Sequence, residues 1–161
     1  RITVMRKIKK LVATLLAATM VMAMGVTAFA ADSLADGKYT AKQNLYKNSA
    51  CTTTSMGDAA LNDMRAEITI ADDEATLVVH THEITYLGLT GHLGKMVVNG
   101  KTVTPKQTTT NGVTDYYFTF TGLDASTIYE GCVITGKFTT YVGSMPMNAT
   151  GYLKLTDITA K

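Results

Sequence analysis

Several features that define other protein classes are scarce in this sequence. The 161 residues include only two cysteines and two prolines, and 17% of the side chains are charged. The sequence has no internal repeat and no low-complexity segment. With two cysteines the chain can form at most one disulfide, and the sequence offers no proline-rich or low-complexity linker.

Signatures of catalysis are also missing. No serine stands in the G-x-S-x-G setting of a nucleophile elbow. The acidic run Asp72, Asp73 and Glu74 lacks the side-chain spacing of an EF-hand loop and has the character of a turn. We therefore expect that the protein is not an enzyme.

The first thirty residues have the pattern of a signal peptide. RKIKK is a basic segment, the following LVATLLAATMVMAMGVTAFA is apolar, and Ala28-Phe29-Ala30 has the small-x-small form of a cleavage site. Cleavage is expected after Ala30, so that residues 31–161 form a single mature domain. No cysteine stands directly at the cleavage site, no second apolar segment is present, and we expect no permanent membrane span in the mature chain. The prediction is a secreted or surface-associated protein.

Removing that segment changes the sign of the net charge. It contains five of the fifteen Lys and Arg residues and no acidic residue, which leaves ten basic and thirteen acidic side chains. A slightly acidic chain without a basic patch is not expected to bind nucleic acid.

The strongest positive signal is a period of two residues. Alternating segments rich in β-forming residues occur at 38–46, 66–71, 75–86, 95–105, 113–123, 132–142 and 149–158. Asn99-Gly100 inside one of them indicates a tight hairpin, and a Thr/Asn/Gly-rich loop precedes residue 113. About eight short antiparallel strands separated by turns predict an all-β fold, an Ig-like β-sandwich.

One long segment, residues 49–64, breaks this pattern. It is too long for a hairpin loop, and Asp58-Ala59-Ala60-Leu61 within it favours one short helical turn. A long structured loop in a compact sandwich is more often functional than idle.

The histidines and the cysteines can each be interpreted in two ways. His80 and His82 share one face of a predicted strand and could bind a metal, but neither a cysteine nor His92 has a ligand spacing with them. The alternative is that both are ordinary half-buried histidines. Cys51 and Cys132 either form one disulfide or remain free thiols.

The methionines of the mature chain fall into two groups. Met64 and Met96 lie in predicted strands and have the character of core or sheet-face residues. Met56 lies in the unusual loop, and Met145 and Met147 flank a proline at the start of the last strand, in the same register as Leu153 and Leu155. Alternation alone favours structural packing for all five.

The mature chain resembles the NEAT domain, the Ig-like haem-binding module of bacterial haem-uptake proteins, and the related Shp-like cell-surface haem-binding proteins. The resemblance rests on four stretches of sequence: LADGKYT (34–40), LYKNSACTTTSMGDAAL (45–61), the VNGK hairpin and GYLKLTD (151–157). Ser55-Met56 is similar to the Ser-Met pair on the short helix that forms one lip of the haem slot. In those families the serine binds a propionate, and the methionine packs against or ligates the iron.

The opposite lip in NEAT domains carries a Y-x-x-x-Y motif followed by an apolar-basic-apolar triplet, which Leu153-Lys154-Leu155 matches. Met147 and Gly151 then stand where the family has its two tyrosines, so the chain departs from the tyrosine-type site at both places. The resemblance instead implies iron held by Met56 and Met147, with Met145 as the alternative to Met147. It implies a haem slot with an apolar wall, for which Leu61, Tyr141, Val142 and Tyr152 are candidates, and Tyr86 or Tyr46 could add stacking surface.

The resulting expectation is a protein that carries haem without transforming it. Another haem-uptake surface protein or a transporter binding protein would be its partner. The main alternative is an Ig-like adhesion or scaffold module that uses the Gly-rich segment YLGLTGHLG (86–94), and a weaker one is a metal site at His80 and His82.

Overall fold

The computed structural model describes residues 32–161, and the expected signal peptide lies outside these residues. Ten strands and two short 3-10 helices follow one another along the described chain. The strands are β1 (Gly37–Tyr46), β2 (Arg65–Ala71), β3 (Glu74–His82), β4 (Ile84–Tyr86), β5 (Leu89–Val98), β6 (Lys101–Val103), β7 (Lys106–Thr110), β8 (Val113–Asp124), β9 (Val133–Val142) and β10 (Met145–Ala160). The helices are η1 (Met56–Ala60) and η2 (Ala125–Thr127).

These strands build an all-β sandwich, as the alternating pattern predicts. The strand pairings within residues 32–161 are all antiparallel, and the hydrogen-bonded order is β4-β5-β9-β10-β1-β2-β3-β8-β7, with β6 paired to β5. Strands from the two ends of this order contribute to one core, which includes Met96 and Phe138 from β5 and β9 and Val79 and Phe118 from β3 and β8.

The predicted strand boundaries need three corrections. The segment 75–86 is divided at Glu83, because the chain leaves β3 there and starts β4, which pairs with β5. The Gly-rich segment 86–94 is largely a hairpin that turns at Leu87 and Gly88, both with positive φ, rather than a loop. The Thr-rich segment before residue 113 is strand β7, joined to β8 by an Asn111-Gly112 turn.

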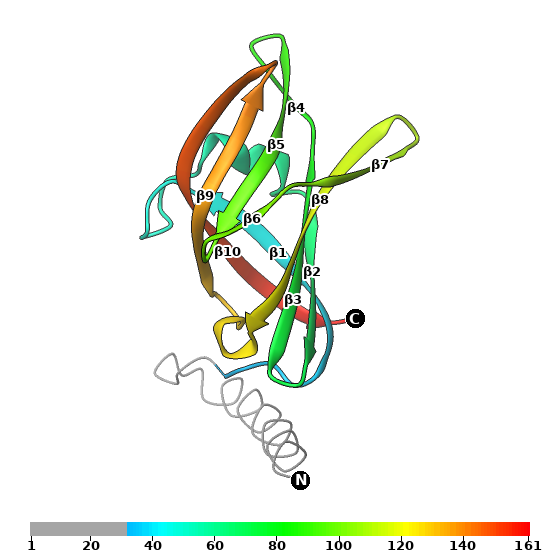
Figure 1. Cartoon of the computed structure of the whole chain (residues 1–161), viewed down its shortest axis with the longest axis vertical. Helices are drawn as coiled ribbons and strands as arrows, with labels where there is room; N and C mark the ends of the chain where they lie inside the picture. The colour runs from blue at the N-terminus through cyan, green and yellow to red at the C-terminus, as the bar shows by residue number, and fades with distance from the viewer. Residues whose placement is uncertain (1–31) are drawn as a thin grey trace.

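The strands place two hairpins at the same end of the molecule. Figure 1 shows the β4–β5 and β9–β10 hairpins extending together to one end, with the η1 segment beside them, while the β7–β8 hairpin points in another direction. Strand β10 is longer than predicted and begins at Met145. At this end β10 pairs with β9 alone, because β1 pairs with it only from Tyr152 onward.

Candidate functional site

The loop that carries Met56 has a defined structure. Ser55 caps η1, and its Oγ accepts a hydrogen bond from the backbone N–H of Gly57 at 3.3 Å. The backbone N–H of Ser55 donates to the carbonyl of Leu45 at 2.8 Å, which fixes the start of η1 to the end of β1. The predicted helical turn in this loop is confirmed, and it begins at Met56 rather than at Asp58.

Asp58 anchors η1 from inside. Its carboxylate is buried, and Oδ1 accepts a hydrogen bond from the backbone N–H of Leu45 at 2.7 Å. Its Oδ2 accepts a second hydrogen bond from the Asn62 amide at 3.0 Å. A buried carboxylate is stable when its oxygens are satisfied in this way. Sequence reasoning missed this positioning role, although an aspartate two residues after Met56 was a signal for it.

η1 packs directly onto the sheet through Gly57. A Cβ added to this glycine would lie 3.2 Å from Cδ2 of Leu93, 3.3 Å from Cδ2 of Leu45 and 3.5 Å from Oγ1 of Thr140. The helix therefore approaches β5, β1 and β9 more closely than most side chains would allow. Of these three neighbours of Gly57, Thr140 is the one that belongs to the β9–β10 hairpin.

The strand register brings Met147 to the same place. Leu93, Thr140 and Met147 form one row across β5, β9 and β10, because Thr140 pairs with both of the others. Directly paired residues share a face of the sheet. Met147 is thus the cross-strand neighbour of Thr140, the residue that lies close to Gly57 of η1. Met56 immediately precedes Gly57 in the sequence.

A second row lies one step closer to the hairpin tips. Gly91, Val142 and Met145 pair across β5, β9 and β10, and they share the face of the first row because side chains alternate along a strand. Leu89 and its partner Tyr86 extend the same face to the end of the β4–β5 hairpin.

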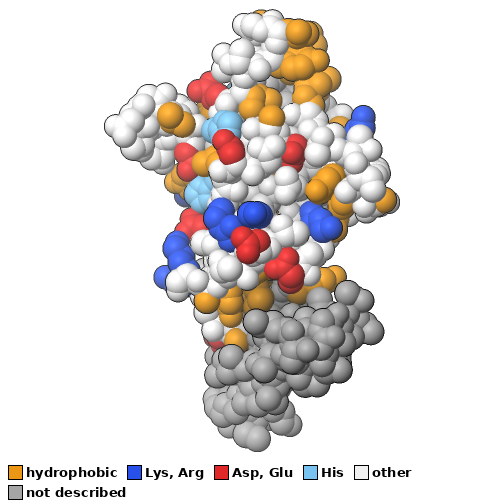
Figure 2. All heavy atoms as spheres, turned by 180° about the vertical axis from the view of Figure 1, so that it is seen from behind, with side chains coloured by type: hydrophobic (Ala, Val, Ile, Leu, Met, Phe, Trp, Pro, Cys, Tyr) orange, Lys and Arg blue, Asp and Glu red, His pale blue; other side chains and the backbone are white. Residues whose placement is uncertain are grey.

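This face is apolar and open to solvent. We call the exposed apolar residues of this face, of η1 and of the β4–β5 turn the apolar tip; they are Met56, Tyr86, Leu87, Leu89, Met145 and Met147. Figure 2 shows hydrophobic side chains gathered at this end of the molecule, where the two hairpins finish. Large exposed apolar patches mark binding surfaces in soluble proteins.

The methionines of the apolar tip differ from the others. Met56, Met147 and Met145 are 42%, 43% and 65% exposed, so their thioethers are accessible. Met96 is fully buried in the core, as predicted. Met64 lies in a bend before β2 and is half-buried, so its placement inside a strand was wrong.

The expected slot walls lie elsewhere. Leu61 is fully buried in the core. Tyr141 and Tyr152 are adjacent in sequence to Thr140 and Gly151, so they point to the face opposite Met147, as does Tyr46, the pairing partner of Tyr152. The candidate site therefore excludes these residues. Of the expected residues, Val142 and Tyr86 do lie on the Met147 face, together with Leu89.

Tyr141 instead belongs to a stack of rings on the opposite face. The His92 ring, in β5, stacks on Tyr141 with a centroid separation of 5.3 Å and on Tyr116 of β8 with a separation of 4.7 Å. A Cβ at Gly94 would lie 2.1 Å from the Tyr141 ring, so this position accepts only glycine. The stack supports β5 and β9 on the face opposite Met147. His92 therefore lies in a strand and not in a Gly-rich loop.

The two histidines of β3 are engaged in ion pairs. His80 Nε2 lies 2.8 Å from Glu67 Oε2 and its Nδ1 lies 3.0 Å from Asp115 Oδ2. His82 Nε2 lies 2.7 Å from Asp63 Oδ1. Within residues 32–161, no group of three or more His, Cys, Asp or Glu side chains is placed to hold a metal ion. These contacts favour structural roles for both histidines.

Charged partners also set the protonation of this cluster. Hydrogen bonds from Lys161 and from His80 lower the pKa of Glu67. Burial acts to lower the pKa of His82, but the hydrogen bond to the Glu83 carbonyl and the contact with Asp63 together raise it above its usual value. The six residues of the apolar tip include no Asp, Glu, His, Lys or Arg.

Comparison with known proteins adds no further identification, because no model of a protein family and no curated protein matches the chain. The part of the chain that the structure describes contains no helix long and apolar enough to span a membrane.

Proposed function

We propose that this protein binds haem non-covalently at the apolar tip, as a secreted or surface-associated carrier, with Met56 and Met147 as the axial ligands. The observation that carries the proposal is that two exposed methionines from different elements adjoin one contact beside an apolar surface. Met56 comes from η1 and Met147 from β10, and both lie beside the contact between Gly57 and Thr140.

The residues present suit such a cargo. A porphyrin needs a broad apolar surface, and the rows beside Met147 contain short side chains at Thr140 and Val142 and none at Gly91. The oxygen of the Ser55 hydroxyl is used in capping η1, which leaves its O–H available to donate to a propionate.

Thioether ligands give the cargo a particular chemistry. Methionine sulfur is a neutral, soft donor that favours reduced iron and raises the reduction potential relative to anionic ligands. Met145 shares the face of Met147 and is the alternative ligand. Because the apolar tip is open, a partner from a haem-uptake system could exchange one methionine for a ligand of its own.

Substitution of the methionines tests the assignment. Haem loaded on Met56→Ala or Met147→Ala should lose the six-coordinate, low-spin spectrum of the reduced form. Loss of one bond worth about 1.4 kcal/mol would weaken binding about tenfold. Met64→Leu is the matched control, because Met64 lies outside the apolar tip. If both alanine variants keep the wild-type spectrum and affinity, the ligand assignment is wrong.

The same surface supports a second candidate, an adhesion or scaffold module that binds another protein without haem. Leu87 at the β4–β5 turn is 85% exposed and would make a natural contact for a protein partner. A wild-type protein that causes no change in the haem spectrum would favour this alternative over the haem carrier.

A further inference from the structure

A hollow opens far from the apolar tip, at the other end of β5. It has a volume of about 390 Å³ and lies between β6 and the second half of β8. In the described structure β6 pairs only with β5, and β7 covers β8 only as far as Tyr117. The two strands therefore flank the hollow without closing it. Nine residues of β5 separate it from Leu89, which is about 30 Å at 3.3 Å per residue.

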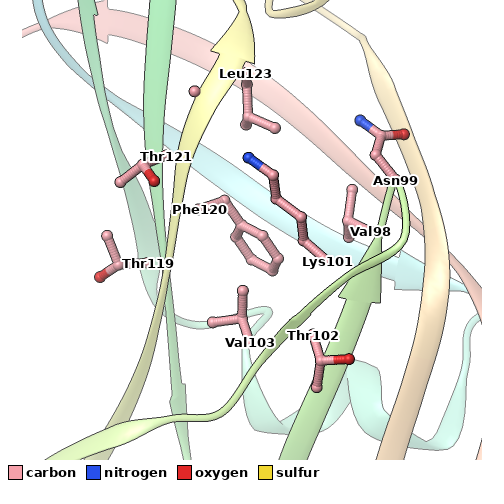
Figure 3. A pocket seen from close by; sticks show the side chains of 10 residues that line it. Val98, Asn99, Lys101, Thr102, Val103, Thr119, Phe120, Thr121 and Leu123 are labelled. Carbon is pink, nitrogen blue, oxygen red and sulfur yellow. The ribbon is translucent and has the colours of Figure 1, made fainter.

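The floor of the hollow is part of the hydrophobic core. Phe120 and Val98 are buried there, and Val103 and Leu123 pack beside them. Figure 3 shows these four side chains arranged around the space, with the Lys101 side chain running across it next to the Phe120 ring. A ligand entering the hollow would therefore meet an apolar surface on several sides.

Among the described residues that line the hollow, Lys101 alone is charged. Its Nζ would lie 3.6 Å from a Cβ added to Gly122, so the ammonium group reaches the far side of the hollow. No carboxylate among residues 32–161 forms an ion pair with it. A second hollow of about 280 Å³ shares Val98, Asn99 and Leu123 with the first and adds no charged residue.

We propose that this hollow binds a small monocarboxylate with an apolar body, such as an aryl or branched-chain acid. The Lys101 ammonium donates to the carboxylate, and the apolar part covers Phe120 and Val98. The volume of this hollow lies within the range of small-molecule sites, which is about 300–1,000 Å³. The proposal is independent of haem binding.

The lining excludes the other common ligand classes. A cationic ligand would find no carboxylate there and would be repelled by Lys101. A phosphate ester is usually held by several charge-assisted hydrogen bonds, and Lys101 is the one charged donor among the described lining residues. A single carboxylate requires one cation and matches the single charge present.

Phenylacetate is a suitable probe, and amide chemical shifts in NMR are a suitable readout. Titration should shift the amides of Lys101, Gly122 and Leu123 in a saturable manner and leave those of Met145 and Met147 unchanged. Phenylacetamide, which has the same shape without the charge, should bind at least about tenfold more weakly, because the attraction between the carboxylate and the Lys101 ammonium is lost.

Two variants complete the test. Lys101→Met should weaken phenylacetate binding about tenfold or more, while Lys106→Met removes an exposed charge outside the lining and should have no effect. The proposal is overturned if phenylacetate causes no saturable shifts, if phenylacetamide binds equally well, or if Lys101→Met binds like wild type. Spectra of the free variants establish that each is folded.

Discussion

At the scale of single residues, Gly151 and Phe138 determine what the β9–β10 hairpin can hold. A Cβ added to Gly151 would lie 2.4 Å from Cδ2 of Phe138 and 3.0 Å from Cδ1 of Leu45. The Phe138 ring thus fills the space that a side chain at position 151 would need. A tyrosine at this position, as in the family that the chain resembles, would require the core to be repacked.

Gly151→Ala should therefore destabilise the fold. Inserting a methyl group into a well-packed core costs about 1–3 kcal/mol, and urea unfolding measures this loss. Thr150→Ala is the matched control, because Thr150 is exposed and its replacement should change the unfolding free energy by about 0.5 kcal/mol or less. Replacing Phe138 by leucine in the Gly151→Ala background should recover part of the loss. A Gly151→Ala protein as stable as wild type would show that the Phe138 ring can move aside at little cost in free energy.

At the scale of elements, the loop that carries η1 is tied to β3 as well as to β1. Gln43 in β1 donates through Nε2 to the carbonyl of Leu61 at 3.1 Å. Three residues after η1, Asp63 accepts a hydrogen bond from His82 of β3. The loop that carries Met56 is thus fixed to β1 through Leu61 and to β3 through Asp63. The contact between His82 and Asp63 depends on pH.

The contact between His82 and Asp63 predicts a pH-dependent stability. The folded protein raises the pKa of His82, so the contribution is complete below about 6.5, the unfolded value, and is lost as the pH rises through the folded value. Because Asp63 is largely exposed, the expected size is about 0.5 kcal/mol. Asp63→Asn should lower the free energy of unfolding by this amount at mildly acidic pH and leave it unchanged at alkaline pH. The same difference at both ends of the pH range would contradict the assignment to His82.

The elements also show how far the sequence could be interpreted. Period-two alternation predicted most strands, because each buries one face, and Asn99-Gly100 predicted a hairpin correctly. Strand β7 was missed because all five of its residues are exposed and give no alternation. Strand β5 was predicted too short, because its first part contains glycines that approach neighbouring groups closely, as Gly91 does at the Tyr141 carbonyl.

The same reasoning applies to the candidate site. Spacing placed Met145 and Met147 on one face of β10, because alternation is a property of the strand. The odd spacing between Met147 and Tyr152 within β10 likewise places these two side chains on opposite faces. The orientation of Tyr141 depended on the register between β9 and β10, which periodicity does not give. The anchoring of η1 by Asp58 depended on a contact between residues thirteen positions apart in the sequence.

At the scale of the whole molecule, the sandwich does not depend on a disulfide. Cys51 and Cys132 are both free thiols in the structure. Of the two alternatives for these cysteines, one disulfide or two free thiols, the structure agrees with the second. Cys132 is buried in the core, and burial raises the pKa of its thiol. Cys51 lies in the loop before η1 and is partly exposed.

A thiol reagent should therefore distinguish the two cysteines. One equivalent of thiol should react in the native protein, at Cys51, and the second only after unfolding, because a buried thiol with a raised pKa is unreactive. The midpoint of thermal unfolding should be the same with and without reductant. A lower midpoint in reductant, or no reactive thiol before reduction, would indicate that a disulfide forms after all.

The central claim concerns the whole protein as a carrier, and a titration of the wild-type chain with haemin tests it most directly. The account predicts saturable binding at one haem per chain and, on reduction, the sharp Soret and α/β bands of a six-coordinate, low-spin iron with two thioether ligands. A spectrum that stays that of free haemin throughout the titration would contradict the account.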